Sequence, residues 1–299
     1  MDNLSLVQLK DDFLAWMASP DEGVSYSKHS IRAYERAIRY FVEVMATYDV
    51  MDAHSVNASW IAVFFKELSP KEASTASINQ YRTILQTWMA FADHEGLIDN
   101  NPVKTYIDQQ KRGLRRRARK ESRLPPVLLQ HEQDAFFDVL FARTHMNRDR
   151  DLALMGLMLD TGLRTQEVCE LRIGQGRELL QAKRLRVIGK GNKERLILPL
   201  LTHQSVLNDW LTQCLETGRQ DKDWLFPSLR DHQLTQTTLY QLINRYLAKA
   251  GIDKSQNGGH LLRHTAASRM LAEGMTLRRV QENLGHSSIK TTEKYLHLI

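Results

Sequence analysis

Cysteine is almost absent from this chain of 299 residues, which holds only Cys169 and Cys214. So low a number excludes a disulfide-rich framework and a zinc cluster of cysteine thiolates, and it indicates a reduced, cytosolic protein. The sequence also lacks a run of roughly 18 apolar residues that would span a bilayer. Between Met1 and Asp12 it lacks the apolar core of a signal peptide. We therefore expect a soluble intracellular protein.

Acidic residues are missing from one short stretch, and this gap accounts for the charge of the chain. Residues 111–120 contain seven basic side chains and no acid, namely Lys111, Arg112, Arg115, Arg116, Arg117, Arg119 and Lys120. Subtracting these seven charges from the net charge of +6 leaves the rest of the chain at −1. A block of like charge repels itself when free and is neutralised by a phosphate backbone, which predicts DNA binding. Taken alone, such a run is as often a solvated linker.

The first 107 residues show a helical pattern throughout. Apolar side chains recur at helical spacing in four segments, near residues 6–17, 31–45, 59–68 and 75–95. The expected N-caps are Ser30, Ser59, and Ser74 or Thr75, and Gly96 is expected to close the fourth helix. Pro102 is expected to end this unit, because proline cannot continue a helix. We predict a compact bundle of four helices with an aromatic core.

The remainder, from about Leu124, has a mixed pattern. Helices are expected at residues 130–143, 148–160, from 165 onward, and at 203–217, 235–250, 259–273, 277–284 and 287–298. Two short β-prone segments, Leu185–Ile188 and Glu194–Leu198, flank the sequence Gly-Lys-Gly-Asn-Lys, which predicts a β-hairpin. The predicted fold is therefore mainly α-helical with a small antiparallel sheet. The expected domains are residues 1–107, a basic linker at 108–126, and residues 127–299.

Two short stretches near the middle of the chain carry groups that suit a phosphate. In Thr161–Glu167, Gly162 permits a sharp helix end and presents Arg164 where a new helix starts, with Glu167 three residues on. An Arg and a Glu at that spacing are more often a surface pair. Lys190, between two glycines at the hairpin tip, is placed to reach into a site. The spacing of a P-loop is absent, and a solvated turn is the alternative for Lys190 alone.

Two more stretches lie near the end of the chain. In His260–His264, His260 and Arg263 share a helix face one turn apart. The pair His260 and His264 also has a spacing that suits zinc, but Arg263 stands on the same face and no third ligand is evident. We therefore predict a phosphate-facing pair and no metal. His286 follows a glycine and precedes Tyr295 by nine residues; a tyrosine there is usually a packing residue.

Together these four stretches resemble the tyrosine recombinase and integrase family. That family's catalytic set runs in the order Arg, Lys, His-x-x-Arg, His or Trp, and Tyr, and it matches Arg164, Lys190, His260, Arg263, His286 and Tyr295. The segments Gly-Lys-Gly-Asn-Lys-Glu-Arg and Leu-Gly-His-Ser-Ser-Ile-Lys-Thr-Thr-Glu-Lys-Tyr are similar to the Xer-type subgroup. The resemblance spans essentially the whole chain, since the first unit is similar to the family's helical core-binding, SAM-like domain.

The resemblance implies attack of the Tyr295 oxygen on a DNA phosphodiester, giving a 3′-phosphotyrosine and a free 5′-hydroxyl. In this chemistry Arg164 and Arg263 clamp the phosphate with bidentate hydrogen bonds. His260 is expected as general base and Lys190 as general acid. His286 is expected to help place Tyr295, and Glu167 to support the site. Neither a metal, a cofactor nor ATP is implied.

The resemblance also implies partners. We expect a double-stranded DNA site, and four protomers, identical or of two kinds, that act on two duplexes. In each protomer the helical first domain and the catalytic domain are expected to form a C-shaped clamp around the DNA, closed by the basic linker. The expected roles are Xer-like resolution of replicon dimers in chromosome partition, or integration and excision of a mobile element, in the cytoplasm at the nucleoid. A type IB topoisomerase and a non-catalytic DNA-binding accessory protein are the alternatives.

Two features depart from the Xer pattern. Residues Arg172–Arg177 replace the usual acidic-aliphatic segment, and we expect a loop there that is about two residues longer. Only four residues follow Tyr295, so the C-terminal helix that family members dock on a neighbouring protomer is expected to be missing.

Overall fold

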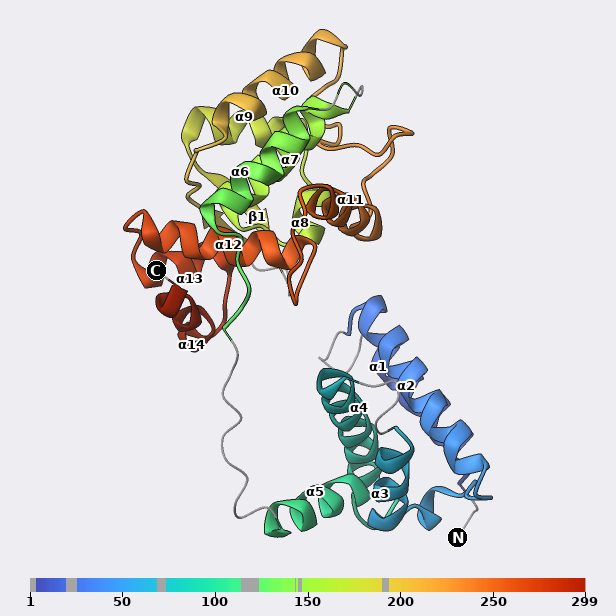
Figure 1. Ribbon diagram of the computed structural model, residues 1–299. Coiled ribbons are helices and arrows are strands. Elements are labelled where there is room, and N and C mark those ends of the chain that lie inside the picture. The colour runs from blue at the N-terminus through green and yellow to red at the C-terminus, as the bar shows by residue number, and fades with distance from the viewer. Residues whose placement is uncertain are drawn as a thin grey trace. The chain divides into compact units, whose positions relative to one another are not determined.

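The computed structural model describes residues 4–19, 26–68, 74–113, 124–142, 144, 147–189 and 194–298. The chain divides into two compact units, Met1–Lys120 and Glu121–Ile299, each with its own hydrophobic core (Figure 1). Both are built mainly from helices, as the sequence predicts. No helix among these described residues combines the length and the apolar character needed to cross a membrane.

The first unit packs helices around an aromatic core. Its elements are α1 (Leu6–Ala18), α2 (Lys28–Ala46), a 3-10 turn η1 (Ala53–Ser55), α3 (Ala58–Glu67), α4 (Thr75–His94) and α5 (Pro102–Gly113). Phe13, Phe41, Phe64 and Trp88 are fully buried, as their helical spacing predicts. The indole N–H of Trp88 donates to the carbonyl of Leu9 at 3.3 Å, so the polar atom of this buried ring is paired.

Two of the expected N-caps of the first unit are wrong. Ser27 caps α2 by accepting from the backbone N–H of Ser30, and Asn57 caps α3 by accepting from the N–H of Ser59. The predicted caps lie three and two residues after the observed ones. They are instead residues of the first turn, whose N–H groups donate to the capping side chain that precedes them. Ser74 caps α4, as predicted.

Pro102 begins a helix, and the expectation that it ends the bundle is wrong. Proline is tolerated in the first turn of a helix, where its missing N–H would have no partner in any case. The side chain of Asn101 accepts from the N–H groups of Val103 and Lys104, at 3.0 and 3.1 Å. The resulting helix, α5, packs against α3 and α4 and continues through Gly113 into the expected linker.

The second unit surrounds one buried helix. Its elements are α6 (Gln130–Phe141), α7 (Arg148–Thr161), α8 (Thr165–Cys169), α9 (Ile173–Ala182), β1 (Leu185–Ile188), β2 (Glu194–Ile197), α10 (Gln204–Glu216), α11 (Gln236–Lys249), α12 (Gly259–Ala272), α13 (Leu277–Leu284), α14 (Ile289–Glu293) and a 3-10 turn η2 (Lys294–Leu298). From Arg150 to Thr161 every residue of α7 is buried, because α6, α10 and α12 pack around it.

The predicted hairpin is present, with β1 and β2 antiparallel and Leu185 opposite Ile197. In the described part of the chain this pair is the whole sheet, which confirms the predicted fold class. Residues Arg172–Arg177, expected to lie in a loop, instead form the N-cap and first turns of α9, so the loop conformation was wrong, while the extra length relative to the Xer pattern stays a prediction. Arg172 lies with its guanidinium 3.1 Å from the centre of the Trp224 ring, and its backbone N–H donates to Gln175. These contacts start a helix where the sequence pattern suggested an irregular segment.

Candidate active site

Arg164 stands at a sharp corner between two helices. α7 ends at Gly162, whose φ of +64° is left-handed, and a Cβ there would lie 2.7 Å from Leu284. Glycine alone suits both the conformation and the space. Arg164 then precedes α8, with its backbone N–H and Nη1 donating to Glu167 at 2.8 and 3.0 Å. Its Nη2 donates to the carbonyl of Gly285 at 2.9 Å, which ties the corner to the end of α13.

Arg263 extends from α12 toward the same place. It is 6% exposed and donates to the carbonyls of Gly162 and Leu284, at 2.6 and 2.5 Å. Burial, followed by the neighbouring Arg164, lowers the pKa of Arg263 to about 10, so the guanidinium keeps its charge at neutral pH. The guanidinium groups of Arg164 and Arg263 therefore lie together at the end of α13.

His286 and Tyr295 come from the segment that follows α13. α13 ends at Gly285 in a left-handed conformation, and Nδ1 of His286 lies 2.9 Å from the hydroxyl of Thr292. The ring of His286 stacks against Tyr295 with centroids 6.5 Å apart. Burial, and then Arg263 and Arg164, lower the pKa of His286 to about 4, so its imidazole is neutral at physiological pH.

Tyr295 is only 2% exposed and lies in η2, packed in a small core with Met270 and Leu284. Its Oη is 2.7 Å from Nδ1 of His264 on α12, and the two ring centroids are 5.6 Å apart. Burial raises the pKa of Tyr295 above its usual value, although Arg263 acts in the opposite direction. The hydroxyl is therefore protonated at neutral pH.

His264 was not among the predicted site residues. Its only signal in the sequence was its place one turn after His260 on the same helix face. Burial, followed by His260, Arg263 and Lys294, lowers the pKa of His264 to about 4. Both histidines that contact Tyr295 are therefore neutral at physiological pH.

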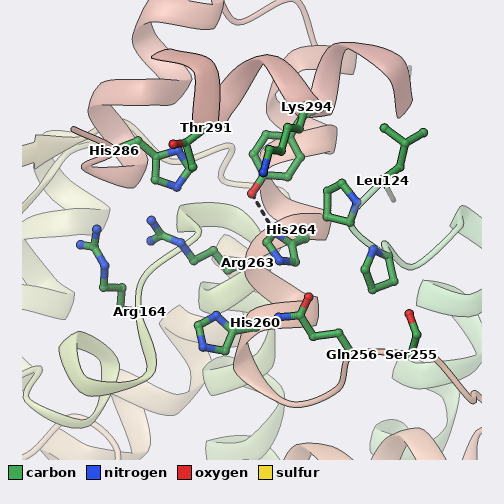
Figure 2. Close-up of a pocket in the computed structure, with 13 residues that line it drawn as sticks. Leu124, Arg164, Ser255, Gln256, His260, Arg263, His264, His286, Thr291 and Lys294 are labelled. Carbon is green, nitrogen blue, oxygen red and sulfur yellow. Dashed lines mark hydrogen bonds between the residues drawn. The ribbon is translucent and has the colours of Figure 1, made fainter. Parts of the chain in front are cut away.

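One cavity of about 660 Å³ brings most of these side chains together (Figure 2). It is lined by Leu124, Pro125, Pro126, Arg164, Ser255, Gln256, His260, Arg263, His264, His286, Thr291, Lys294 and Tyr295. Five of the six predicted catalytic residues are in this set. The sixth, Lys190, lies outside the described residues. His260 is exposed in the first turn of α12, and Lys294 is a cation of the lining that the sequence reasoning did not single out.

The described lining of this cavity contains arginine, lysine and histidine side chains and no carboxylate. Such a lining suits an anion, and two adjacent guanidiniums suit the oxygens of a phosphate group. A tyrosine side chain lies in the same wall, and a tyrosine hydroxyl is a group that can act as an oxygen nucleophile. The arrangement fits phosphoryl transfer to tyrosine.

Glu167 is not part of the cavity lining but binds a residue that is. It accepts from Arg164, and it also accepts from Nη1 and Nη2 of Arg195 of β2, at 2.6 and 2.8 Å. Burial by itself raises the pKa of Glu167, but the hydrogen bonds from Arg195 and from the backbone of Arg164 hold it below its ordinary value. Glu167 is therefore ionised. Arg195 is a second residue that the sequence reasoning missed, since nothing local links it to Glu167.

The predicted DNA-binding block is described only at its start. Lys111 is exposed in the last turn of α5, with Nζ 3.2 Å from Asp108. The backbone of Arg112 continues this helix. The remaining five lie outside the described residues, namely Arg115, Arg116, Arg117, Arg119 and Lys120.

Comparison with known proteins identifies both parts of the chain. Residues 127–299 match the phage integrase family, and residues 22–96 match the phage integrase N-terminal SAM-like domain. A tyrosine recombinase XerD of Lacticaseibacillus casei is 35% identical over 247 residues, which cover 80% of this chain and 77% of that protein. A tyrosine recombinase XerD of Listeria monocytogenes is 29% identical over 295 residues, covering 97% of this chain and 94% of that protein.

Solved structures share the fold. A lambda integrase dimer bound to a COC′ core site aligns over 98% of this chain and 95% of that one, with a TM-score of 0.71 and 20% identity. The XerH site-specific recombinase bound to difH substrate aligns over 98% and 81%, with a TM-score of 0.69 and 22% identity. The phage integrase match covers residues 127–299, which is more than half of the sequence and includes Tyr295. The chain therefore belongs to the tyrosine recombinase, or phage integrase, family.

Proposed function

We propose that this protein is a site-specific DNA recombinase that cuts and rejoins DNA through a 3′-phosphotyrosine at Tyr295. The observation that carries the proposal is the shared cavity, in which Arg164, Arg263 and the Tyr295 hydroxyl meet without a carboxylate in the described lining. Arginines stabilise the negative charge that phosphoryl transfer places on the non-bridging oxygens, without a metal being required.

In the proposed reaction the Oη–P bond forms as the bond from phosphorus to the 5′-oxygen breaks. Arg164 and Arg263 hold the non-bridging oxygens, and His286 keeps Tyr295 in place through ring stacking. Lys190 is proposed to give a proton to the departing 5′-oxygen. The role of His260 as general base stays a prediction. Because the phosphotyrosine conserves the phosphodiester linkage, rejoining needs no ATP.

The proposed DNA contacts extend beyond the cavity. We assign DNA binding to residues 1–107, to the basic linker at 108–126 and to the catalytic domain at 127–299, and most contacts are expected to reach phosphates. Strand exchange would use four protomers on two duplexes, in the cytoplasm at the nucleoid. Relatives named XerD support a Xer-like role in resolving replicon dimers, and integration or excision of a mobile element is the other outcome to be tested.

The test is covalent trapping on DNA. Supercoiled plasmid carrying a candidate site is incubated with the protein without metal or ATP, and the reaction is denatured. We expect 3′-linked adducts that disappear in Tyr295→Phe and persist in Tyr240→Phe, a matched change at an exposed tyrosine of α11. Absence of adducts on every candidate site contradicts the proposal. Resolution products distinguish recombination from the simple relaxation expected of a type IB topoisomerase.

The two arginines provide a second test. Arg164→Ala and Arg263→Ala should each abolish adduct formation and leave DNA affinity largely intact. Arg263→Ala should also lower thermal stability, because it leaves the carbonyls of Gly162 and Leu284 buried without their donor. Strong loss of DNA binding by a folded Arg164→Ala protein would mean that this side chain serves mainly to grip DNA.

A further inference from the structure

Three consecutive carbonyl groups at the end of α13 each accept from a different arginine. Arg195, Arg263 and Arg164 donate in that order to the carbonyls of residues 283, 284 and 285, at 2.9, 2.5 and 2.9 Å. The final carbonyls of a helix have no partners within it and carry a partial negative charge, so they suit cations. The end of α13 therefore holds three guanidiniums together, and two of the three arginines line the cavity.

The side chain of Asn283 connects this end of α13 to the hairpin. Asn283 is fully buried and is not one of the residues that line the cavity. Its Oδ1 accepts from the backbone N–H of Leu198 at 3.0 Å, and its Nδ2 donates to the carbonyl of the same residue at 2.8 Å. Leu198 comes directly after β2, whose pairing with β1 ends at Leu185 and Ile197. The amide thus takes the place of a neighbouring strand for the first residue beyond the ladder.

This connection needs an amide and not merely a side chain of the right size. Burying a polar group is costly unless it is hydrogen-bonded, and the backbone groups of Leu198 are subject to the same cost. The Asn283 amide also lies with Nδ2 3.4 Å from the thioether sulfur of Met275. An aliphatic side chain of similar volume would fill the space but would leave the N–H and the carbonyl of Leu198 without these partners. The position of β2 relative to α13 therefore depends on the amide itself.

We propose that Asn283 is a positioning residue for DNA cleavage; this inference rests on the proposed function. Its amide fixes β2 against the end of α13, and β2 carries Arg195. Arg195 binds both oxygens of Glu167, which in turn accepts from Arg164. Loss of the amide lets β2 and Arg195 shift, and Arg164 then loses its alignment with Arg263 on the non-bridging oxygens. Asn283 acts on the reaction only through these arginines.

A substrate that carries less charge tests the proposal. Once wild-type adducts have identified the cleaved phosphate, duplexes are made with a phosphodiester or a methylphosphonate at that position. Replacing a non-bridging oxygen by a methyl group removes the negative charge that the arginines stabilise. On the phosphodiester we expect Asn283→Leu to slow single-turnover adduct formation by roughly 10- to 100-fold, with DNA affinity unchanged. On the methylphosphonate this deficit relative to wild type should largely disappear, as should that of Arg164→Ala.

Two further variants serve as controls. Trp210→Phe removes a side-chain N–H that donates to the carbonyl of Leu225 at 2.8 Å, in the same unit but outside the cavity lining. It should lower thermal stability and leave the rates on both substrates at the wild-type level. Arg195→Ala should slow cleavage as Asn283→Leu does, and the double variant should be no slower than Arg195→Ala alone, because both changes act on one route.

Asn283→Asp is the second variant, for use if Asn283→Leu does not fold. Burial favours the neutral form of its carboxyl, which accepts from the N–H of Leu198 and donates to the carbonyl as the amide does. Its deficit relative to wild type should therefore shrink as pH falls. A deficit that is constant with pH overturns the proposal.

The outcomes for Asn283→Leu separate positioning from folding. A folded Asn283→Leu protein that cleaves at the wild-type rate overturns the proposal. An equal deficit on the phosphodiester and the methylphosphonate also overturns it, because Asn283 would then serve folding alone. If wild type forms no adduct on any site, the proposed function fails; wild-type adducts together with a fully active Asn283→Leu protein contradict this inference alone.

Discussion

Both carboxylate oxygens of Glu167 are bound by the guanidinium of Arg195, at 2.6 and 2.8 Å, and the side chains are only 5% and 12% exposed. Nε of Arg195 also donates to the carbonyl of Asn283 at 2.9 Å. Since Glu167 accepts from Arg164 as well, one buried ion pair joins β2, α8 and the end of α13. The position of Arg164, which we propose to be catalytic, thus depends on a residue of the hairpin.

Removing this ion pair should lower the free energy of unfolding and slow DNA cleavage. Arg195→Ala leaves a buried carboxylate with Arg164 as its remaining cationic partner, so we expect a loss of about 3–5 kcal/mol in the free energy of unfolding and slower adduct formation. Arg186→Ala is the control, because its ion pair with Glu194 is 62% and 55% exposed and should be worth at most about 1 kcal/mol. Urea denaturation measures both variants, and similar losses would contradict a special role for Arg195.

Gly259 sets how closely the start of α12 approaches α8. A Cβ at this position would lie 2.2 Å from Cγ2 of Thr165, the residue after Arg164. Gly259→Ala should therefore push α12 away and reduce cleavage, by up to about 100-fold if the groups move by 1 Å. Thr165→Ala removes the methyl group in question, so the double variant should recover much of the rate. Strictly additive effects of the two changes would show that this contact does not position the site.

The free energy of unfolding should begin to decrease at a pH above the range in which the carboxylates titrate. The pKa values of His264 and His286 are lowered from 6.5 to about 4 in the folded protein. Between these values the unfolded chain binds more protons than the native one, so stability is fully present above pH 6.5 and decreases as pH falls toward 4. The urea midpoint should decline from pH 6.5 to 5, less steeply in His264→Asn. An equal slope in wild type and His264→Asn would contradict a buried neutral His264.

The basic segment should determine how DNA affinity depends on salt. Replacing the seven basic residues of 111–120 by glutamine should weaken binding and reduce the slope of log K against log salt by about 0.9 for each phosphate that the segment neutralises in the wild-type complex. Binding measured on cognate and unrelated duplexes should weaken equally, because interactions with phosphates carry no sequence information. An unchanged slope would identify the segment as a passive linker.

Much of the fold was predictable because its signals are local. Helical periodicity located most of the long helices, and β-prone residues around a glycine-rich tip located β1 at Leu185–Ile188 and β2 to within one residue. Errors arose where a local rule has two outcomes. Pro102 can end a helix or begin one, and only the capping side chain of Asn101 and the packing of α5 on α3 and α4 decide between them.

By itself the sequence determined the family and the order of the residues that reach the cavity, because motif residues and their spacing can be identified without knowledge of the fold. Arg164, His260, Arg263, His286 and Tyr295 were all named from that spacing, and all line one cavity. Only the tertiary structure decided which histidine forms a hydrogen bond with Tyr295. His264 and Tyr295 are 31 residues apart, and the packing of η2 on α12, rather than any local pattern, brings their polar atoms within 2.7 Å.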